Sequence, residues 1–318
     1  MNMNRYILQR ITLVIPTIIG ASLLTFLLIR LLPGDIVDIL MGGDPQIGAD
    51  VLAKVRESLG LNQPFYLQYW HWIIGMLRGD IGTSLRSGTP VGQRILESLP
   101  VTLQLAFMAI VFSCLLAIPL GILSAVKRNS ATDVVTRIIG LIGLSFPGFW
   151  LATMFLLISS RVFKWTPPLT WVSPFQDLWG NLKITLAPAI ILAVQPLAVI
   201  MRMTRASMLE VLGQDYIRTA AAKGLSDRLV LFRHALKNAI IPVLTVIGIQ
   251  LGSLIGGSVI IEQIFSLPGV AFYLLSGIYE RDYPVVQGTV LFLSIVFIVI
   301  NLAVDLLYGY VDPRIRHA

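Results

Sequence analysis

Long apolar stretches separated by polar segments dominate the pattern of this sequence. A helix needs roughly 20 apolar residues to cross the hydrocarbon core of a membrane. Six stretches meet that length, and we expect each to be a spanning helix, because open strand edges in lipid leave backbone groups unpaired. They cover residues 11–32, 102–126, 138–160, 184–201, 239–261 and 287–308. The pattern therefore predicts an all-α integral membrane protein with a single transmembrane domain over residues 1–318.

The first apolar stretch follows Arg5 and Arg10, an arrangement that also occurs in signal peptides. Its 22 residues exceed the roughly 7–15 apolar residues of a signal peptide, and no small-residue cleavage site follows it. We therefore expect an uncleaved membrane anchor.

The first polar segment, residues 33–101, is too long to be a simple connector. It contains helix-like stretches at 50–59 and 66–77, and its seven acidic residues outnumber its five basic ones. A small external cap that meets a soluble partner or a cationic group fits this segment. A solvated loop fits it equally well.

The second long polar segment, residues 202–238, carries apolar positions at helical spacing among basic residues. Two short amphipathic helices are predicted, over 205–223 and 227–238. Gly224 is placed to end the first of them, and Ser226 is placed to cap the start of the second. Such a loop either docks a partner protein or lies on lipid headgroups.

Three glycines in the fifth apolar stretch are spaced by four residues, at Gly248, Gly252 and Gly256. This spacing puts them on one face of a helix, where another helix can approach closely. Close helix packing is the first interpretation, and an interface along a translocation path between subunits is compatible with it. Prolines at 147, 188, 196 and 242 predict irregular helices in the third to fifth stretches.

Composition and charge support the membrane assignment. Mean hydropathy is +0.80 and only 13% of residues are charged, which excludes a soluble domain. The net charge of +7 by itself suggests binding to nucleic acid, but the distribution of the basic residues along the chain argues against it. With the N-terminus inside, the inner segments hold 14 Lys and Arg residues, whereas the longer outer segments hold nine. This bias predicts that both termini are cytoplasmic and that no nucleic acid binds.

Catalytic chemistry is missing from the sequence. It has no Gly-x-x-x-x-Gly-Lys-Ser/Thr loop, so ATP is not hydrolysed by this chain. Its three histidines are scattered and its one cysteine, Cys114, lies in an apolar stretch, so no metal or other cofactor is predicted. Asp305 is the clearest carboxylate within a predicted span, and Glu262 lies at the end of another. The sequence therefore shows no series of intramembrane carboxylates that could carry protons or sodium ions in a self-powered carrier. It also shows no cluster of polar residues inside the spans, which a membrane-embedded enzyme would need.

Several runs of residues in the sequence resemble those of a known protein family. The runs DYIRTAAAKGLS at 215–226 and RHALKNAIIP at 233–242 resemble the EAA loop of ABC importer permeases, in the form seen in the dipeptide and oligopeptide branch. Further likenesses occur along nearly the whole chain, in LPGD at 32–35, LGL at 59–61, GDIG at 79–82, MTR at 203–205, ERDYPVVQ at 280–287 and DPRIR at 312–316.

The resemblance implies the type I importer permease fold with a cytoplasmic coupling loop at 202–238. Within that loop it implies a segment that docks to an ATPase, formed by Arg218, Thr219, Ala220, Ala221, Ala222, Lys223, Gly224 and Leu225. Gly224 would shape the corner, and Ala220 and Ala221 would allow close approach. The family pattern begins Glu-Ala-Ala where this chain has Arg218-Thr219-Ala220, and a basic residue is frequent where it has Ala221.

The resemblance also implies the assembly. We expect a second homologous permease, two cytosolic ATP-binding subunits, a periplasmic or extracellular substrate-binding protein, and the lipid of a bacterial cytoplasmic (inner) membrane. Di- or oligopeptides are the expected cargo of this non-enzymatic subunit, with glutathione, nickel chelates and oligosaccharides as alternatives within the family. A secondary carrier or channel that works without an ATPase is the alternative function.

Overall fold

The computed structural model describes residues 3–31, 56–57, 62–168 and 170–311, and it is mainly helical. The long elements are α1 (Met3–Leu31), α4 (Phe65–Leu77), α5 (Val91–Val126), α6 (Ala131–Ser145), α7 (Gly148–Arg161), α8 (Leu178–Leu212), α11 (Leu236–Gly257) and α14 (Tyr283–Val311). The short ones are α9 (Asp215–Ala222), α10 (Asp227–Leu229), η1 (Val230–Ala235), α12 (Val259–Ile264) and α13 (Val270–Tyr279).

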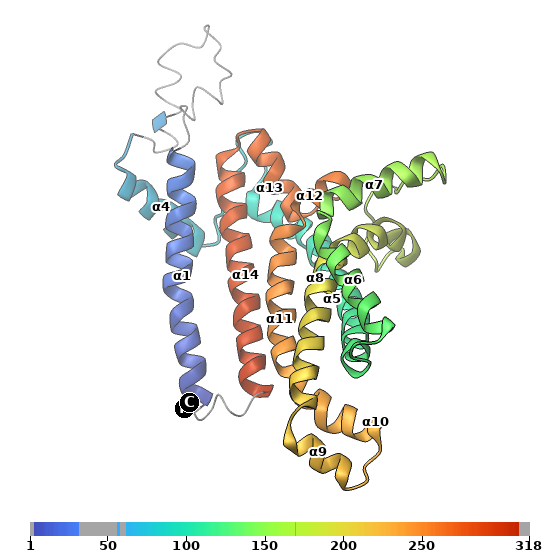
Figure 1. Cartoon of the computed structure of the whole chain (residues 1–318). Coiled ribbons are helices and arrows are strands. Elements are labelled where there is room, and N and C mark those ends of the chain that lie inside the picture. Colours follow the sequence, from blue (N-terminus) through green and yellow to red (C-terminus); the bar gives the residue numbers. More distant parts are fainter. Residues whose placement is uncertain (1–2, 32–55, 58–61, 169, 312–318) are drawn as a thin grey trace. The chain divides into compact units, whose positions relative to one another are not determined.

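The chain forms two compact units. The first contains Met1–Ile11, Val101–Leu267 and Val299–Ala318, and the second contains Thr12–Pro100 and Pro268–Ile298. In the first unit α8 is the central helix, because α6 and α11 both pack along it (Figure 1). Fifteen of its residues are buried, among them the two prolines inside the helix, Pro188 and Pro196.

The predicted third span, 138–160, is not one straight helix. The structure breaks it into α6 and α7, which meet at 93°. Proline causes the break, because Pro147 has no N–H to continue the helix and pushes the preceding residue out of the helical region. Phe146 is accordingly extended, with φ −96° and ψ 124°. The pair is apolar enough to serve as one broken span or as a re-entrant loop.

Within the described residues, four segments are long and apolar enough to span a membrane, or five if the bent pair counts as one span. They are Val91–Val126, Leu178–Leu212, Asp227–Gly257 and Tyr283–Val304. In α1 the described apolar part, Ile11–Leu27, is shorter. The number of six spans therefore stays a prediction, whereas the helical membrane fold is confirmed.

The second unit joins two motifs that are far apart in the sequence. Asp282 accepts hydrogen bonds from the hydroxyl of Ser84 at 2.6 Å and from the backbone N–H of Leu85 at 3.3 Å. This carboxylate is 1% exposed and fastens the segment before α5 to the α13–α14 turn. The predicted helix at 66–77 is confirmed as α4, while the predicted stretch at 50–59 lies almost wholly outside the described residues.

One carboxylate is buried more deeply than the sequence indicates. In the fifth predicted stretch, 239–261, α11 ends at Gly257, and a new helix, α12, carries Glu262 with its side chain fully buried. The carboxylate accepts hydrogen bonds from Thr102 Oγ1 at 2.8 Å and Ser258 Oγ at 2.9 Å. These bonds offset part of the cost of burying the charge. The side chain of Asp305, the other acidic candidate, lies outside the described part of the chain.

Candidate functional site

The polar segment after α8 folds into a small projection that we call the knob, residues 213–235, comprising α9, α10 and η1. It lies at the end of α8 and α11 (Figure 1). The predicted helix at 205–223 is wrong in its extent, because α8 runs on to Leu212 and stops at Gly213. Gln214 then turns the chain with an extended ψ of 148° before α9 begins.

The second predicted helix, 227–238, also differs in the structure. It begins at α10 as expected, but η1 carries it through one π-helical turn directly into α11. Asp227–Gly257 is therefore a single continuous apolar segment that starts in the knob. As a consequence the knob is rigidly continuous with one of the long helices of the unit.

A small apolar core holds the knob against the long helices. Its buried members come from α5, α8, α9, η1 and α11, and they are Ala125, Met208, Ile217, Ala220, Val230, Ala235 and Ala239. The amide of Asn238 donates a hydrogen bond to the hydroxyl of Tyr216 at 2.8 Å and ties α9 to α11. The position of α9 is thus fixed by packing on α8 and α11.

The predicted docking residues divide into an inner and an outer set. Ala220 is 8% exposed and faces the core of the knob, so it supports α9 and does not offer a surface to another protein. Leu225 is half-buried against the same core. The remaining residues of the set are exposed, and they are Arg218, Thr219, Ala221, Ala222, Lys223 and Gly224.

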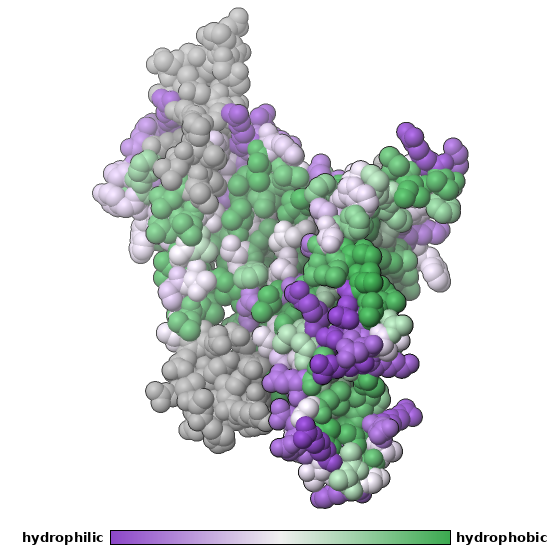
Figure 2. Space-filling model, in the orientation of Figure 1, coloured by the Kyte–Doolittle hydropathy of each residue, from purple (hydrophilic) through white to green (hydrophobic). Residues whose placement is uncertain are grey.

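Apolar side chains add to this outer surface. Tyr216 is 43% exposed and Phe232 is 53% exposed, although both belong to a segment rich in charge. The space-filling view shows a hydrophobic patch on the knob, bordered by hydrophilic residues (Figure 2). The sequence analysis did not single out these two aromatic residues, because their spacing also fits a helix lying on lipid headgroups.

The corner after α9 requires glycine. Gly224 has φ +78°, a left-handed conformation that costs other L-residues roughly 1–2 kcal/mol. Its predicted role as the end of α9 is confirmed, since Lys223 is the capping position and Gly224 follows it. A Cβ added at Gly224 would meet no atom of this chain within 4 Å. Ser226 precedes α10 as predicted, but its side chain makes no capping hydrogen bond.

Sequence reasoning missed a buried ion pair close to the knob. Asp133, fully buried in the first turn of α6, accepts hydrogen bonds from Arg205 Nε at 2.8 Å and Arg205 Nη2 at 3.0 Å. Ser124 Oγ at 2.6 Å and the backbone N–H of Asn129 at 3.0 Å complete its coordination. The pair joins the α5–α6 turn to the last turns of α8, which lead into the knob.

The glycine face of α11 is split by its surroundings. Gly248 lies so close to Val304 of α14 that a Cβ would overlap that side chain. Gly252 is buried as well. Gly256 is exposed, and a Cβ there would meet nothing within 4 Å. Gly248 therefore serves helix packing inside this chain, whereas Gly256 leaves an open surface.

Two family models match most of the chain. Residues 117–317 match the family model of the binding-protein-dependent transport system inner membrane component, and residues 3–106 match the model of its N-terminal part. A crystal structure of an amino acid ABC transporter with histidines covers 70% of this chain and 94% of its own, at 15% identity and a TM-score of 0.49.

Two curated relatives are similar over nearly their full lengths. The dipeptide transport system permease protein DppB of Escherichia coli strain K12 is 44% identical over 99% of both chains. The DppB protein of Alkalihalophilus pseudofirmus is 41% identical over 99% of this chain and 100% of its own. This chain therefore belongs to the binding-protein-dependent transport system inner membrane component family, the permeases of ABC importers.

Proposed function

We propose that this chain is one of two permease subunits of an ATP-driven importer of di- or oligopeptides. The assignment of this cargo rests on the two dipeptide permeases that are 44% and 41% identical to this chain. Substrate would be delivered by an external binding protein and pass between the two permeases into the cell, and ATP-driven closure of the ATPases would reset the gate. Glutathione, nickel chelates and oligosaccharides are the alternative cargoes.

The outer face of the knob is the proposed docking site for a cytosolic ATPase. The observation that supports this docking site is how the knob is built. One face of α9 packs on a buried core, and its other face is exposed. A force applied to a rigidly held helix passes to the helices that hold it, here α8 and α11. The open space beside Gly224 leaves room for the close approach of a partner.

The proposed orientation puts both termini and the knob in the cytoplasm. The supporting observation is the excess of Lys and Arg in the segments assigned to that side, which the positive-inside rule requires. In this arrangement α1 and the bent α6–α7 pair complete six spans. The second permease would contact the exposed part of the α11 glycine face at Gly256.

A pair of glycine variants tests the docking assignment. Gly224→Val should leave the chain inserted but release the ATPases, because a β-branched residue does not hold φ +78° at the corner. Gly88→Val is the matched control, since Gly88 also has positive φ, at +69°, and open space around its Cβ, but lies outside the knob. The measurements are ATPase co-purification and ATP-dependent peptide uptake by the reconstituted complex.

The proposal predicts that Gly224→Val loses most of the bound ATPase and of the uptake, while Gly88→Val retains its ATPase. Full ATPase retention and uptake by Gly224→Val would overturn the docking site. Equal loss of ATPase from both variants would show that strain anywhere in the chain has this effect, and it would equally remove the support for the knob.

A further inference from the structure

A groove with a volume of about 250 Å³ lies in the first unit, where the bent α6–α7 pair meets other helices of that unit. Its lining comes from the start of α7, the middle of α8, the second half of α11 and the first turn of α12. In this part of the unit α8 packs against α7, α11 and α12 (Figure 1). The lining therefore includes central residues of three predicted spans, 138–160, 184–201 and 239–261.

Two glutamine side chains line this groove in the middle of apolar helices. Gln195 of α8 is exposed and Gln250 of α11 is partly exposed, and neither carboxamide has a hydrogen-bond partner among the described residues. An amide that faces lipid tails without a hydrogen bond is costly, because nothing replaces the water that it loses. This face of α8 and α11 is therefore unsuited to lipid and suited to water or to another polar molecule.

The backbone around the groove is irregular at the same depth. Phe146 lines the groove and has left the helical conformation, in the middle of an apolar segment. Pro196 lines it as well, and because proline has no N–H, the helical hydrogen bond to the C=O of Leu192 is missing. Irregular backbone at membrane depth occurs where it is buried in protein or lines a water-filled cavity. The exposed Phe146 fits the second case.

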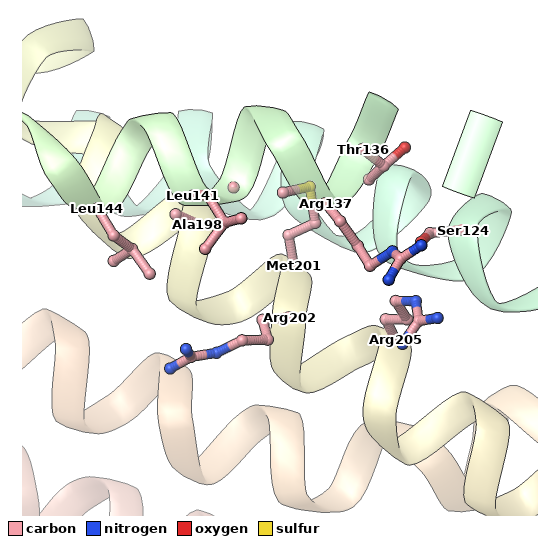
Figure 3. Close-up of a pocket in the computed structure, with 10 residues that line it drawn as sticks. Ser124, Thr136, Arg137, Leu141, Leu144, Ala198, Met201, Arg202 and Arg205 are labelled. Carbon is pink, nitrogen blue, oxygen red and sulfur yellow. The ribbon is translucent and has the colours of Figure 1, made fainter. Parts of the chain in front are cut away.

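The chemistry of the groove is neutral, since none of its described lining residues is charged. The pocket between α6 and α8 nearer the knob is different, because Arg137 and Arg205 lie there beside Ser124 (Figure 3). Both arginines pair with Asp133, so their charge is already used within the chain. In the groove the polar groups are the two carboxamides and the hydroxyl of Ser253.

We propose that this groove is the part of the peptide path that this permease supplies, and that Gln195 and Gln250 bind the main chain of the peptide in transit. The inference rests on the proposed importer function. A carboxamide has two donor hydrogens and one acceptor oxygen, so it pairs with the C=O and the N–H of a peptide bond whatever the side chains are. Neutral hydrogen bonds are also weak enough for the peptide to leave again.

The polar face of α11 lies beside the face that we assign to the second permease. Gln250, Ser253 and Gly257 follow one another at spacings of three and four residues, so they share one face of the helix. Gly256, the proposed contact with the second permease, lies three residues from Ser253 and next to Gly257. A second permease seated at Gly256 would therefore close the groove from the side, and the peptide would pass between the two chains.

The first test removes both carboxamides with the double variant Gln195→Leu and Gln250→Leu. The complete complex, with its binding protein and ATPases, is reconstituted in proteoliposomes, and uptake of alanylalanine is measured together with ATP hydrolysis. The number of peptides transported per ATP should fall roughly tenfold, because two neutral hydrogen bonds to the peptide are lost. Gln263→Leu is the matched control and should keep this ratio, since Gln263 is exposed on α12 but does not line the groove.

The second test narrows the groove with Gly257→Leu. A Cβ at Gly257 would meet no atom of the chain within 4 Å, so the added side chain occupies the groove without displacing the core. Uptake of leucylleucine should fall more than uptake of glycylglycine, whereas a folding defect lowers both equally. Gly20→Leu in α1 is the control, since Gly20 has the same open space but lies outside the groove.

A lower ratio of peptide to ATP in the double variant, with a size-dependent loss in Gly257→Leu and neither effect in the controls, would support the groove. An unchanged ratio, an equal loss in Gln263→Leu, or an equal loss of both dipeptides in Gly257→Leu would overturn it, while ATP-driven uptake by the unchanged complex would leave the importer function standing. Absence of ATP-driven peptide uptake by the unchanged complex would overturn the proposed function, and the peptide path with it.

Discussion

The ion pair between Arg205 and Asp133 shows what a single residue pair contributes near the knob. Arg205 keeps only 23% of its side chain exposed, and Asp133 keeps none. Removing one partner of a buried pair leaves the other charge without a partner and with little water to solvate it, which destabilises the fold. When one partner of an exposed pair is removed, water solvates the other charge and the cost in stability is small. The geometry of the α5–α6 turn therefore depends on this pair more than on any surface ion pair described in the knob.

Asp133→Ala is accordingly expected to lower the free energy of unfolding by about 3–5 kcal/mol. Asp215→Ala is the matched control, because Asp215 also pairs with an arginine, Arg218, but their side chains are 95% and 75% exposed. Its cost should stay below about 1 kcal/mol. Chemical unfolding of both variants in detergent, followed by circular dichroism, measures the difference. Equal stability of the two variants would remove the structural role of Asp133.

Single residues were predictable from the sequence only where the signal was local. The left-handed corner at Gly224 follows from a glycine placed after a helical stretch, and the structure has it. Arg205 lies 72 residues from Asp133 in the chain, and Thr102 lies 160 residues from Glu262. Hydrophobic periodicity carries no information about contacts over such separations, so both buried carboxylates were missed as structural centres.

Helix ends are the features that the apolar pattern predicts least well. The pattern shows where a helix is buried in lipid, and α5 and α8 both continue beyond their predicted spans, to Val91 and Leu212. Polar helical turns outside the membrane leave no apolar signal. Conversely, the stretch 138–160 is apolar throughout, and only Pro147 within it signals the 93° bend.

The glycine face of α11 gives a prediction at the level of the element. Gly248→Ala should destabilise the chain by about 1–3 kcal/mol, because the added methyl group overlaps Val304. Gly256→Ala should be neutral or slightly stabilising, since alanine is the better helix former and the position is open. Thermal unfolding of the two variants in detergent distinguishes them. A larger loss at Gly256 than at Gly248 would contradict the assignment of the packing contact.

For the whole molecule, the fold class and the family were predictable from the sequence, and the comparisons confirm both. Long apolar stretches indicate that the chain lies in a membrane, and motifs spread over its length indicate the family to which it belongs. Neither reports how the chain divides into units or which surfaces remain open for partners. Those properties emerge from packing, such as the core that turns Ala220 inward and leaves Ala221 exposed.

The most direct test of the account is affinity purification of the full chain from its native membrane in mild detergent, followed by identification of the bound proteins. The account predicts a second permease of the same family together with P-loop ATPases. From Gly224→Val it predicts the second permease without the ATPases. Recovery of this chain alone, with peptide uptake by proteoliposomes that contain no ATPase, would contradict the account and establish a self-sufficient carrier.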